Sequence, residues 1–536
     1  MKTRYIEPII ITTIVLLLLS SCSQHRILTL MATTPKLVYD KSQTKGLNNY
    51  QKDAIYLTET IKQAYPRLGD KISVEAFEKE KSVLLCDLSR IDNDLDFEIR
   101  LQKFVALLKD GHSKVEVDYS TSDAEVYPVA FFKEKDRWVL ANINRMVADS
   151  SVIGCQVISV NGITMQDIES RAGKLEAGEN EFWTNLLFSS HQRFPSYWKA
   201  LEVTTGNDYK LDIIVLKEGE EKSFTIYPAS KARGYQLSFK PGTTPFTRKQ
   251  NEGFYYRTDK DGNYAYLQMN TSLDYVSVKS EIASYTHFFI RPFALAYLKK
   301  QKKDARNFGL TLQSLFKEIN EKKIDNLIID LRNNTGGDER TGKQLLWYLD
   351  ETEDIKGFTT YVNVSDYFRQ TVKQDYKKYN REYKEKHGSQ IPSGEVNLND
   401  EILGHNYFDD IMQKSSPYLL DVSIPKFKGK VYVLIGNITF SAAQMLATTI
   451  ADNKLATMVG HPTGNKPTGQ TGSSLLKLPH TKKVVTLSYM LMERPDHSKN
   501  KERSLFPDIE INSDFREFIN GTDVGFDYII QEINKQ

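Results

Sequence analysis

The sequence predicts a multidomain α/β protein with a helical N-terminal domain, a β-rich middle domain and an α/β core built on a mainly parallel sheet. Three observations support this prediction. The chain has 536 residues, which is too long for one hydrophobic core. Apolar residues follow helical spacing up to about residue 112 and strand-like runs from about residue 126. Two buried-strand patterns, ending near residues 331 and 435, each pass through a corner into a helix, as is typical of parallel α/β sheets.

The composition is that of a globular protein, with 40% hydrophobic and 26% charged residues. The net charge of +2 arises from 71 basic and 69 acidic residues. This balance gives no reason to expect a nucleic acid or another acidic polymer as partner. No apolar run of 18 residues follows the N-terminus, so we expect no internal membrane span.

The first 22 residues have the pattern of an export signal. Lys2 and Arg4 form a basic region, and residues 9–19 form a short apolar core. The segment LSSC that ends at Cys22 resembles the lipobox of bacterial lipoproteins, in which the cysteine is lipidated and becomes the mature N-terminus. We therefore predict a signal peptide over 1–22 and a lipid anchor at Cys22. The alternatives are an ordinary signal peptide and an uncleaved anchor.

The location predicted from this segment is the cell envelope. No acidic cluster follows Cys22, which favours a lipoprotein facing the periplasm of a Gram-negative bacterium. The other two cysteines, Cys86 and Cys155, fall in different predicted domains. We expect them to be buried free thiols, although an exported pair could form a disulfide.

Changes in composition divide the chain into units. Residues 23–45 are polar and are interpreted as a tether, and Gly and Pro residues mark a linker before the core. Two inserts with helical patterns, near 285–320 and 365–428, are expected to decorate the core without a chemical role. The predicted units are a signal peptide (1–22), a tether (23–45), a helical domain (46–122), a middle domain (123–230), a linker (231–254), a core (255–520) and a C-terminal segment (521–536).

Helical spacing is clearest in the N-terminal domain. One helix is predicted over Asn49–Tyr65, and a second presents an apolar face that ends at Leu108. Gly111 is expected to stop the second helix, and a strand is predicted over 114–117. The apolar face comprises Phe97, Leu101, Phe104, Val105 and Leu108.

Short strands dominate the middle domain. Within it, residues 154–162 resemble the strand and Asn-Gly turn of PDZ domains, followed by a helix over 165–172. The resemblance implies a module that binds an extended peptide by adding a strand to a sheet edge. The stretch 176–198 is longer than a simple PDZ domain needs. The predicted strands are 129–132, 138–143, 156–160, 211–215 and 224–226.

Two strand–corner–helix units define the predicted core. Residues 324–331 form a buried strand that leads through a Gly-Gly corner into a helix, and residues 431–435 do the same before Ser441. Ser441 is thus expected at the first turn of a helix. Unpaired backbone N–H groups and the positive helix end can stabilise an oxyanion there. A serine at such a position is also often a simple N-cap.

Four motifs in this order resemble those of one enzyme family, the C-terminal processing and tricorn-core serine peptidases. Each motif is weak alone, but their order and spacing are specific. A fifth, weaker match is FPDI at 506–509, although Ser504 and Leu505 depart from the family pattern. The four motifs are LLKDGHS at 107–113, LRNNTGG at 331–337, TFSAA at 439–443 and VGHPTG at 459–464, where His461 replaces the usual acid.

The resemblance implies amide hydrolysis by an activated serine on a ClpP/crotonase-like core. Ser441 would be the nucleophile. The backbone N–H of Ala442, with that of Gly336 or Gly337, would form the oxyanion hole, because glycine allows close backbone approach. We expect neither a cofactor nor a metal for this reaction. No metal-binding motif is evident in the sequence.

The general base is open between two family solutions. Lys466 and Gln470 stand 25 and 29 positions after Ser441, which resembles the Ser-Lys-Gln arrangement of processing proteases. The tricorn-core branch instead uses a histidine, here His112, oriented by a late glutamate, for which Glu502 is the candidate. A lysine base must have its pKa lowered to about 7–8, whereas histidine needs no such shift. We favour His112 and keep Lys466 as the alternative.

The predicted function is an exported serine endopeptidase, tail-specific in type, that cuts unfolded or C-terminal protein segments. Its partners would be protein or peptide substrates and, through Cys22, a membrane. The alternative is a lipoprotein that keeps the protease fold and binds peptides without cleaving them. The sequence gives neither the cleavage preference nor the oligomeric state.

Overall fold

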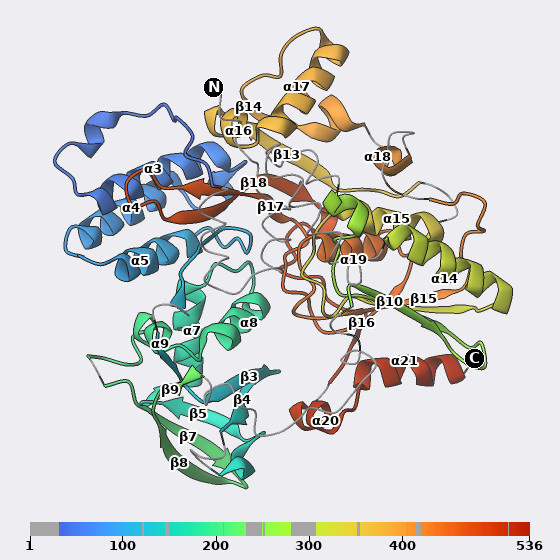
Figure 1. The fold of residues 1–536 in the computed structure, drawn as a ribbon, viewed down its shortest axis with the longest axis horizontal. Coiled ribbons are helices and arrows are strands. Elements are labelled where there is room, and N and C mark those ends of the chain that lie inside the picture. Colours follow the sequence, from blue (N-terminus) through green and yellow to red (C-terminus); the bar gives the residue numbers. More distant parts are fainter. Residues whose placement is uncertain are drawn as a thin grey trace.

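The computed structural model describes residues 32–535 except for 120–122, 145–148, 207, 232–248, 250–251, 280–306, 351–353, 405, 413–417, 419 and 513. The predicted signal peptide, Cys22 and most of the predicted linker lie outside the described residues. No helix in the described part of the chain is long and apolar enough to cross a membrane. Figure 1 shows the N-terminal helices and the middle domain along one side of the core.

A six-stranded sheet forms the centre of the core. Its first two strands pair antiparallel and all others pair parallel, which confirms the predicted mainly parallel sheet. In spatial order the strands are β10 (Phe254–Thr258), β11 (Ala265–Met269), β12 (Asn326–Asp330), β15 (Lys430–Ile435), β16 (Thr457–Gly460) and β19 (Ile509–Glu510).

Alternate residues of these strands enter two different hydrophobic layers. Leu327 and Ile329 of β12 pack in the larger core together with side chains of α14 (Phe308–Lys322), α15 (Glu339–Leu349) and α19 (Ala442–Asp452). Ile328 points to the opposite face, where the C-terminal helix α21 (Val524–Asn534) covers the sheet. Helices on both faces explain why the strand sequences are almost continuously apolar.

The prediction of a decorating insert over 285–320 is wrong for its described part. Helix α14 follows β11 along the chain and precedes β12, and it packs in the main core. The aromatic and lysine-rich composition of the segment suggested a surface feature, but the apolar residues repeat at helical spacing and point inward. The buried residues of α14 include Phe308, Leu312, Leu315, Phe316 and Ile319.

A second, antiparallel sheet joins the core to the N-terminal helices, which share one hydrophobic cluster with it. Part of the predicted insert 365–428 contributes to this unit. The strands are β1 (Lys114–Val115), β18 (Val484–Glu493), β13 (Thr359–Val364), β14 (Gly394–Asn397) and β17 (Gly469–Lys477). The helices are α3 (Asn49–Ala64), α4 (Val74–Leu88), α5 (Asp94–Ala106), α16 (Asp366–Thr371) and α17 (Lys373–His387), and the short α18 (Asp409–Met412) lies near α15.

The predicted apolar face of α5 is confirmed, because all five of its residues are buried. The predicted stop is wrong. The helix ends at Ala106, and Lys109, not Gly111, adopts a positive φ of 44°. Gly111 has another role, since a Cβ there would lie 2.8 Å from the Phe440 ring. A glycine is therefore needed for the close approach of this segment to the core.

The middle domain is an antiparallel sheet with helices, and the five predicted strands are present. Its PDZ-like character stays a prediction. The stretch 176–198 contributes two helices that sequence periodicity did not predict. The strands are β3 (Val129–Glu134), β4 (Arg137–Ile143), β5 (Gln156–Val160), β6 (Ile163–Thr164), β7 (Leu211–Lys217) and β8 (Glu220–Ile226), with a separate pair β2 (Glu125–Val126) and β9 (Ala229–Ser230). The helices are α7 (Met165–Leu175), α8 (Glu181–His191) and α9 (Pro195–Ala200).

Two further expectations need correction. Residues 32–45 of the predicted tether are not loose, because Thr33 bridges to Leu476 of β17 and Pro35 accepts a hydrogen bond from Tyr56. Cys86 and Cys155 are both unpaired, but only Cys155 is buried. Cys86 is exposed because it lies on a solvent-facing position of α4.

A buried ion-pair network joins the first corner of the core to the C-terminal segment. Arg332 pairs with Asp330 at the end of β12 and with Asp523, whose carboxylate also caps α21. Both acids are at least 96% buried as side chains. The expectation that Asp330 and Arg332 hold the sheet corner agrees with these contacts.

We predict that Asp523→Ala lowers the free energy of unfolding by about 3 kcal/mol, because the substitution removes a buried partner of Arg332 and a helix cap. Urea denaturation measures the change. Asp523→Asn keeps the cap oxygen, so it should lower the free energy of unfolding by less than Asp523→Ala does. Asp527→Ala, on the exposed side of α21, should change the free energy of unfolding by less than about 0.5 kcal/mol. Equal effects at both positions would contradict the role of the network.

Candidate active site

Ser441 lies at the corner between β15 and α19, as predicted. Its φ of 53° and ψ of −126° are unusual for a residue with a side chain, so its backbone is strained. The Ser441 hydroxyl does not cap α19, which argues against the simple N-cap interpretation. The hydroxyl is carried on a tight turn at the carboxyl end of a central strand, a place where α/β folds present reactive groups.

Backbone donors surround this serine. The N–H of Ala442 has no acceptor among the described residues, since the hydrogen bonds of α19 begin with the N–H of Ala443. Gly336 approaches closely, because a Cβ on it would lie 2.6 Å from the Ser441 Cβ and 2.9 Å from the Ala442 nitrogen. Its own N–H, however, is donated to Asn334 Oδ1 at 2.8 Å. Gly337 has no such acceptor in the described part of the chain, so its N–H is the better second donor.

His112 lies next to the nucleophile turn. Its ring packs on Phe440 with centroids 4.7 Å apart, and Trp183 of α8 stacks on Phe440 at 4.0 Å. Neither ring nitrogen of His112 makes a well-aligned hydrogen bond with a described residue, although both are buried. Burial lowers the pKa of His112, an effect that Asp110 and the carbonyl of Gln470 oppose. A neutral imidazole beside a serine is suited to accept a proton.

Asp110 anchors the segment that carries His112. Its Oδ1 accepts the His112 backbone N–H at 2.9 Å, and its Oδ2 accepts the hydroxyls of Tyr65 and Ser113, each at 2.6 Å. Burial alone would raise the pKa of Asp110, but His112 and the two hydroxyls hold it below its ordinary value. The Ser113 hydroxyl also accepts the N–H of Ser488 in β18. These bonds fix the position of the loop relative to the second sheet.

Lys466 and Gln470 lie on the loop and strand that follow β16. Burial and the charge of Lys71 lower the pKa of Lys466, while Glu179 opposes this shift. Gln470 donates its side-chain N–H to the Pro66 carbonyl at 2.9 Å. The Gln470 side chain thus bonds the segment after α3, while its backbone carbonyl lies close to the His112 ring. Among the described residues it makes no hydrogen bond to Lys466.

Glu502 lies elsewhere. Its carboxylate pairs with Arg494, which also pairs with Asp452. Because the Arg494 side chain is only 1% exposed, its buried positive charge is stabilised by pairing with both carboxylates. The acid beside His112 is Asp110, with its Oδ1 3.9 Å from His112 Nδ1. The position of Glu502 does not support the predicted role in orienting His112.

Two site residues were missed in the sequence. The Ser441 N–H is donated to Asn465 Oδ1 at 2.8 Å, and Asn465 donates its amide to Glu179. Burial and the charge of Asp110 raise the pKa of Glu179 to about 7. Potential ligand atoms of Asp110, His112 and Glu179 lie within 4.8 Å of one another, so these three side chains form one cluster. The one feature of the sequence that could have pointed to Glu179 was the unusual length of the stretch 176–198.

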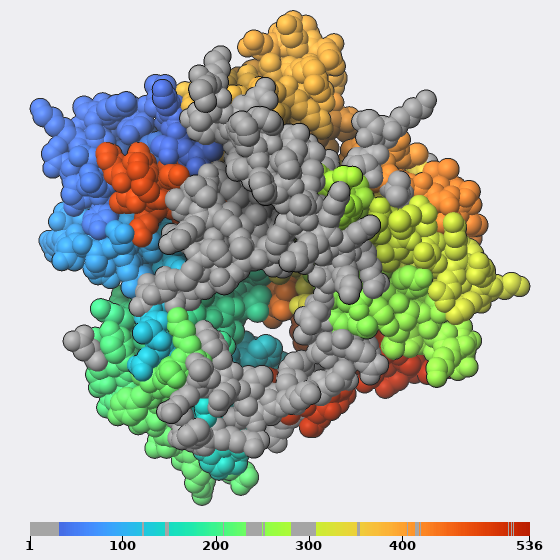
Figure 2. Space-filling view, in the orientation of Figure 1, coloured from blue at the N-terminus to red at the C-terminus, as the bar shows by residue number. Residues whose placement is uncertain are grey.

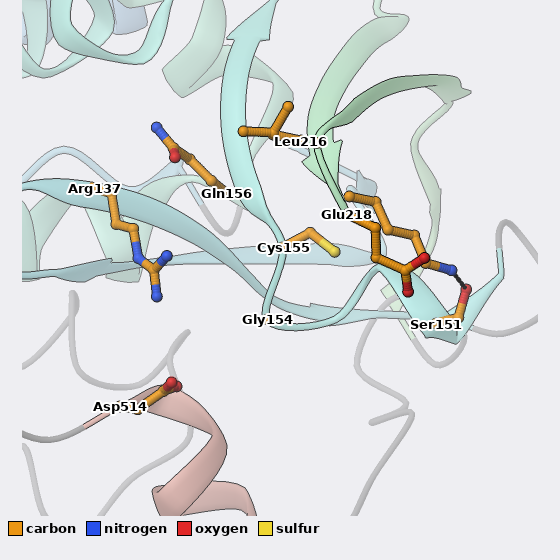
Figure 3. A pocket seen from close by; sticks show the side chains of 10 residues that line it. Arg137, Ser151, Gly154, Cys155, Gln156, Leu216, Glu218 and Asp514 are labelled. Carbon is orange, nitrogen blue, oxygen red and sulfur yellow. Dashed lines mark hydrogen bonds between the residues drawn. The ribbon is translucent and has the colours of Figure 1, made fainter.

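A separate cavity of about 390 Å³ lies in the middle domain and shares no residue with this site. Figure 3 shows Arg137, Cys155 and Gln156 at its wall, with Asp514 facing them from the segment before α20 (Phe515–Asn520). The Lys217 ammonium donates to Ser151 at one end. We assign no chemistry to this cavity.

Comparison with known proteins indicates the class of enzyme that this chain resembles. Residues 295–511 match the model of peptidase family S41. The crystal structure of mature CPAF aligns with 91% of this chain and 98% of its own at 15% identity, with a TM-score of 0.57. Mature CPAF complexed with lactacystin aligns with 91% and 99% at 16% identity, with the same score. The photosystem II D1 C-terminal processing protease aligns with 89% and 99% at 12% identity, with a TM-score of 0.38. No curated protein matches the sequence.

Together with the strained serine and its backbone donors, the family match over residues 295–511 indicates a serine-type peptidase. More particularly, residues 295–511 are similar to peptidase family S41, and the motifs resemble those of the C-terminal processing and tricorn-core enzymes. The CPAF structures, at low identity, agree in fold with nearly the whole chain.

Proposed function

We propose that this chain is an exported serine endopeptidase that hydrolyses peptide bonds of unfolded or C-terminal protein segments. The observation that carries the proposal is the backbone at Ser441. A positive φ on a non-glycine residue costs free energy and persists only where the surrounding structure enforces it. The strain holds Ser441 at a corner where the N–H groups of Ala442 and Gly337 have no acceptor among the described residues, and where His112 packs on the preceding residue, Phe440.

The chemistry follows from these groups. The Ser441 hydroxyl attacks the substrate carbonyl while His112 accepts its proton, and the developing oxyanion accepts hydrogen bonds from the N–H groups of Ala442 and Gly337. His112 then gives the proton to the leaving amine, and water cleaves the acyl-enzyme in the reverse sense. Lys466 is the alternative base, but within the described part of the chain no hydrogen bond joins its ammonium to Ser441, whereas His112 packs on Phe440, the residue before the nucleophile.

Substrate capture is assigned to the middle domain. An antiparallel sheet with a free edge can bind an extended peptide by strand addition. Of the two edge strands, β3 is already bonded at Phe131 by the Gln192 side chain, so the largely exposed β8 is the better candidate. In the space-filling view an opening lies between the middle domain and the core (Figure 2). An extended chain held on the middle domain would have a short path to Ser441, because α8 of that domain contacts Phe440 through Trp183.

The proposed location is the cell envelope. It rests on the export signal over 1–22 and the lipobox-like LSSC segment. A lipid at Cys22, facing the periplasm, would hold the peptidase at a membrane and leave its body in water.

Covalent labelling with a fluorophosphonate tests the proposed activity. We expect the chain without residues 1–22 to form one adduct at Ser441, found by peptide mass spectrometry, because such probes react with activated serines. Ser441→Ala should abolish both the adduct and peptide cleavage. Wild-type protein that is folded by circular dichroism and gives no adduct, with or without added peptide, would overturn the proposal.

A further inference from the structure

Glu179 belongs to the middle domain but contacts the nucleophile loop of the core. It lies in the short connection between α7 and α8. The next residue, Asn180, caps α8 through its side-chain oxygen and donates its amide to the carbonyls of Thr463 and Arg503, at 3.2 and 2.9 Å. The connection is thereby attached both to the loop that follows β16 and to the segment that precedes β19.

One oxygen of Glu179 holds this loop. Glu179 Oε2 accepts the Lys466 backbone N–H at 2.5 Å and the amide of Asn465, whose Oδ1 in turn accepts the Ser441 N–H. The strained backbone of Ser441 needs such support, because a residue at φ 53° relaxes unless its neighbours restrain it. Glu179 is thus two hydrogen bonds away from the nucleophile.

The other oxygen of Glu179 is available. Among the described residues, Glu179 Oε1 is buried without a hydrogen-bond partner, and neither ring nitrogen of His112 makes a well-aligned hydrogen bond, although the Gln470 carbonyl lies close to the ring. The oxygens of Asp110 already accept a backbone N–H and two hydroxyls. Among the three clustered side chains, Glu179 therefore offers the spare acceptor for an imidazole that becomes charged during reaction.

On the basis of the proposed function, we propose that Glu179 is a positioning residue of the peptidase: its carboxylate orients and stabilises His112 and, through Asn465, holds the backbone of Ser441. The middle domain then supplies part of the catalytic machinery as well as a binding surface. A peptidase core without this connection would lack both restraints.

The charge state of Glu179 gives the proposal a pH signature. Its pKa is raised to about 7 by burial and by Asp110, and the cations that face the cluster are Lys71 and Lys466. The active form has neutral His112 and ionised Glu179, so activity should rise as the pH increases through about 7. Removing the carboxylate charge removes this titration and further lowers the pKa of His112. The acidic limb of the rate profile should then move to lower pH.

Glu179→Gln is the decisive variant, since it keeps the shape and one acceptor oxygen. We expect kcat to fall by roughly 100-fold or more, KM to change little, and the acidic limb of kcat/KM to shift to lower pH. Glu179→Asp, which restores the charge, should recover the position of the limb. Asn465→Ala breaks the connection to Ser441 and also removes a donor that lowers the pKa of Glu179. It should therefore lower kcat and move the limb to higher pH, opposite to the shift expected for Glu179→Gln.

Glu176→Gln is the matched control. Glu176 is a buried acid three residues away that pairs with His191 rather than with the site, so kcat and the pH profile should stay at wild-type values. Thermal melts of all variants separate misfolding from lost positioning. A folded Glu179→Gln enzyme with wild-type kcat and an unshifted limb would overturn this inference alone, because wild-type labelling at Ser441 would still support the proposed function. Loss of labelling in the wild type would overturn the function itself.

Discussion

His112→Ala is expected to lower kcat for peptide cleavage by roughly 10⁴-fold or more, whereas Lys466→Ala should cost less than about tenfold. The two residues differ in their position relative to Ser441 and in their charge state. The His112 ring packs on Phe440, the neighbour of Ser441, and burial keeps the ring neutral. The pKa of Lys466 is lowered by burial, but a lysine starts from about 10.4 and must lose its proton to act as a base.

The two variants should be compared by kcat, KM and fluorophosphonate adduct at Ser441. We expect His112→Ala to lose the adduct and Lys466→Ala to keep it, with the acidic limb of the Lys466→Ala profile near that of the wild type. His497→Ala controls for general effects of losing a histidine, because His497 lies on a short turn remote from the serine in sequence and contacts Thr359. The opposite pattern, with Lys466→Ala inactive and His112→Ala active, would assign the base to Lys466 and the chemistry to the processing-protease branch.

The sequence predicts those parts of the site that are encoded locally. At Ser441 and at Gly336 an apolar strand, a corner and a helical pattern follow one another within about 20 residues, so periodicity alone places both corners at the same sheet edge. The structure has both corners there, with Gly336 against Ser441. His112 was identified by its motif, although the expected helix stop at Gly111 was wrong.

Contacts between distant segments were not predictable in this way. Glu179 and Asn465 are separated by 286 residues, and neither shows a pattern that marks it as part of a site. Their contact depends on how the middle domain docks against the core. For the same reason Glu502 was a reasonable candidate by order along the chain, yet the structure gives it to Arg494, whose burial demands a second acid. The segment of helix α14 was placed in a decorating insert because its aromatic and lysine-rich composition was given more weight than the helical spacing of its apolar residues.

Gly336→Ala is expected to lower kcat by roughly 10²–10³-fold while KM changes little. A methyl group at this position would lie 2.6 Å from the Ser441 Cβ and 2.9 Å from both the Ala442 nitrogen and the Phe440 carbonyl oxygen. None of these atoms is the end of a flexible side chain, so the nucleophile turn itself must move. The φ of 102° at Gly336 adds strain for any residue with a Cβ. Donors aimed at a developing oxyanion lose most of their effect when they are displaced.

Gly388→Ala is the matched control for this variant. Gly388 also has a positive φ, 74°, but a Cβ there would meet no atom within 4 Å. It should therefore show a similar backbone penalty, about 1 kcal/mol in the free energy of unfolding, with an unchanged kcat. Steady-state kinetics and urea denaturation on both variants separate catalysis from stability. A Gly336→Ala enzyme as active as Gly388→Ala would mean that the Gly336-Gly337 corner does not shape the oxyanion site, and the donors would have to be sought elsewhere along α19.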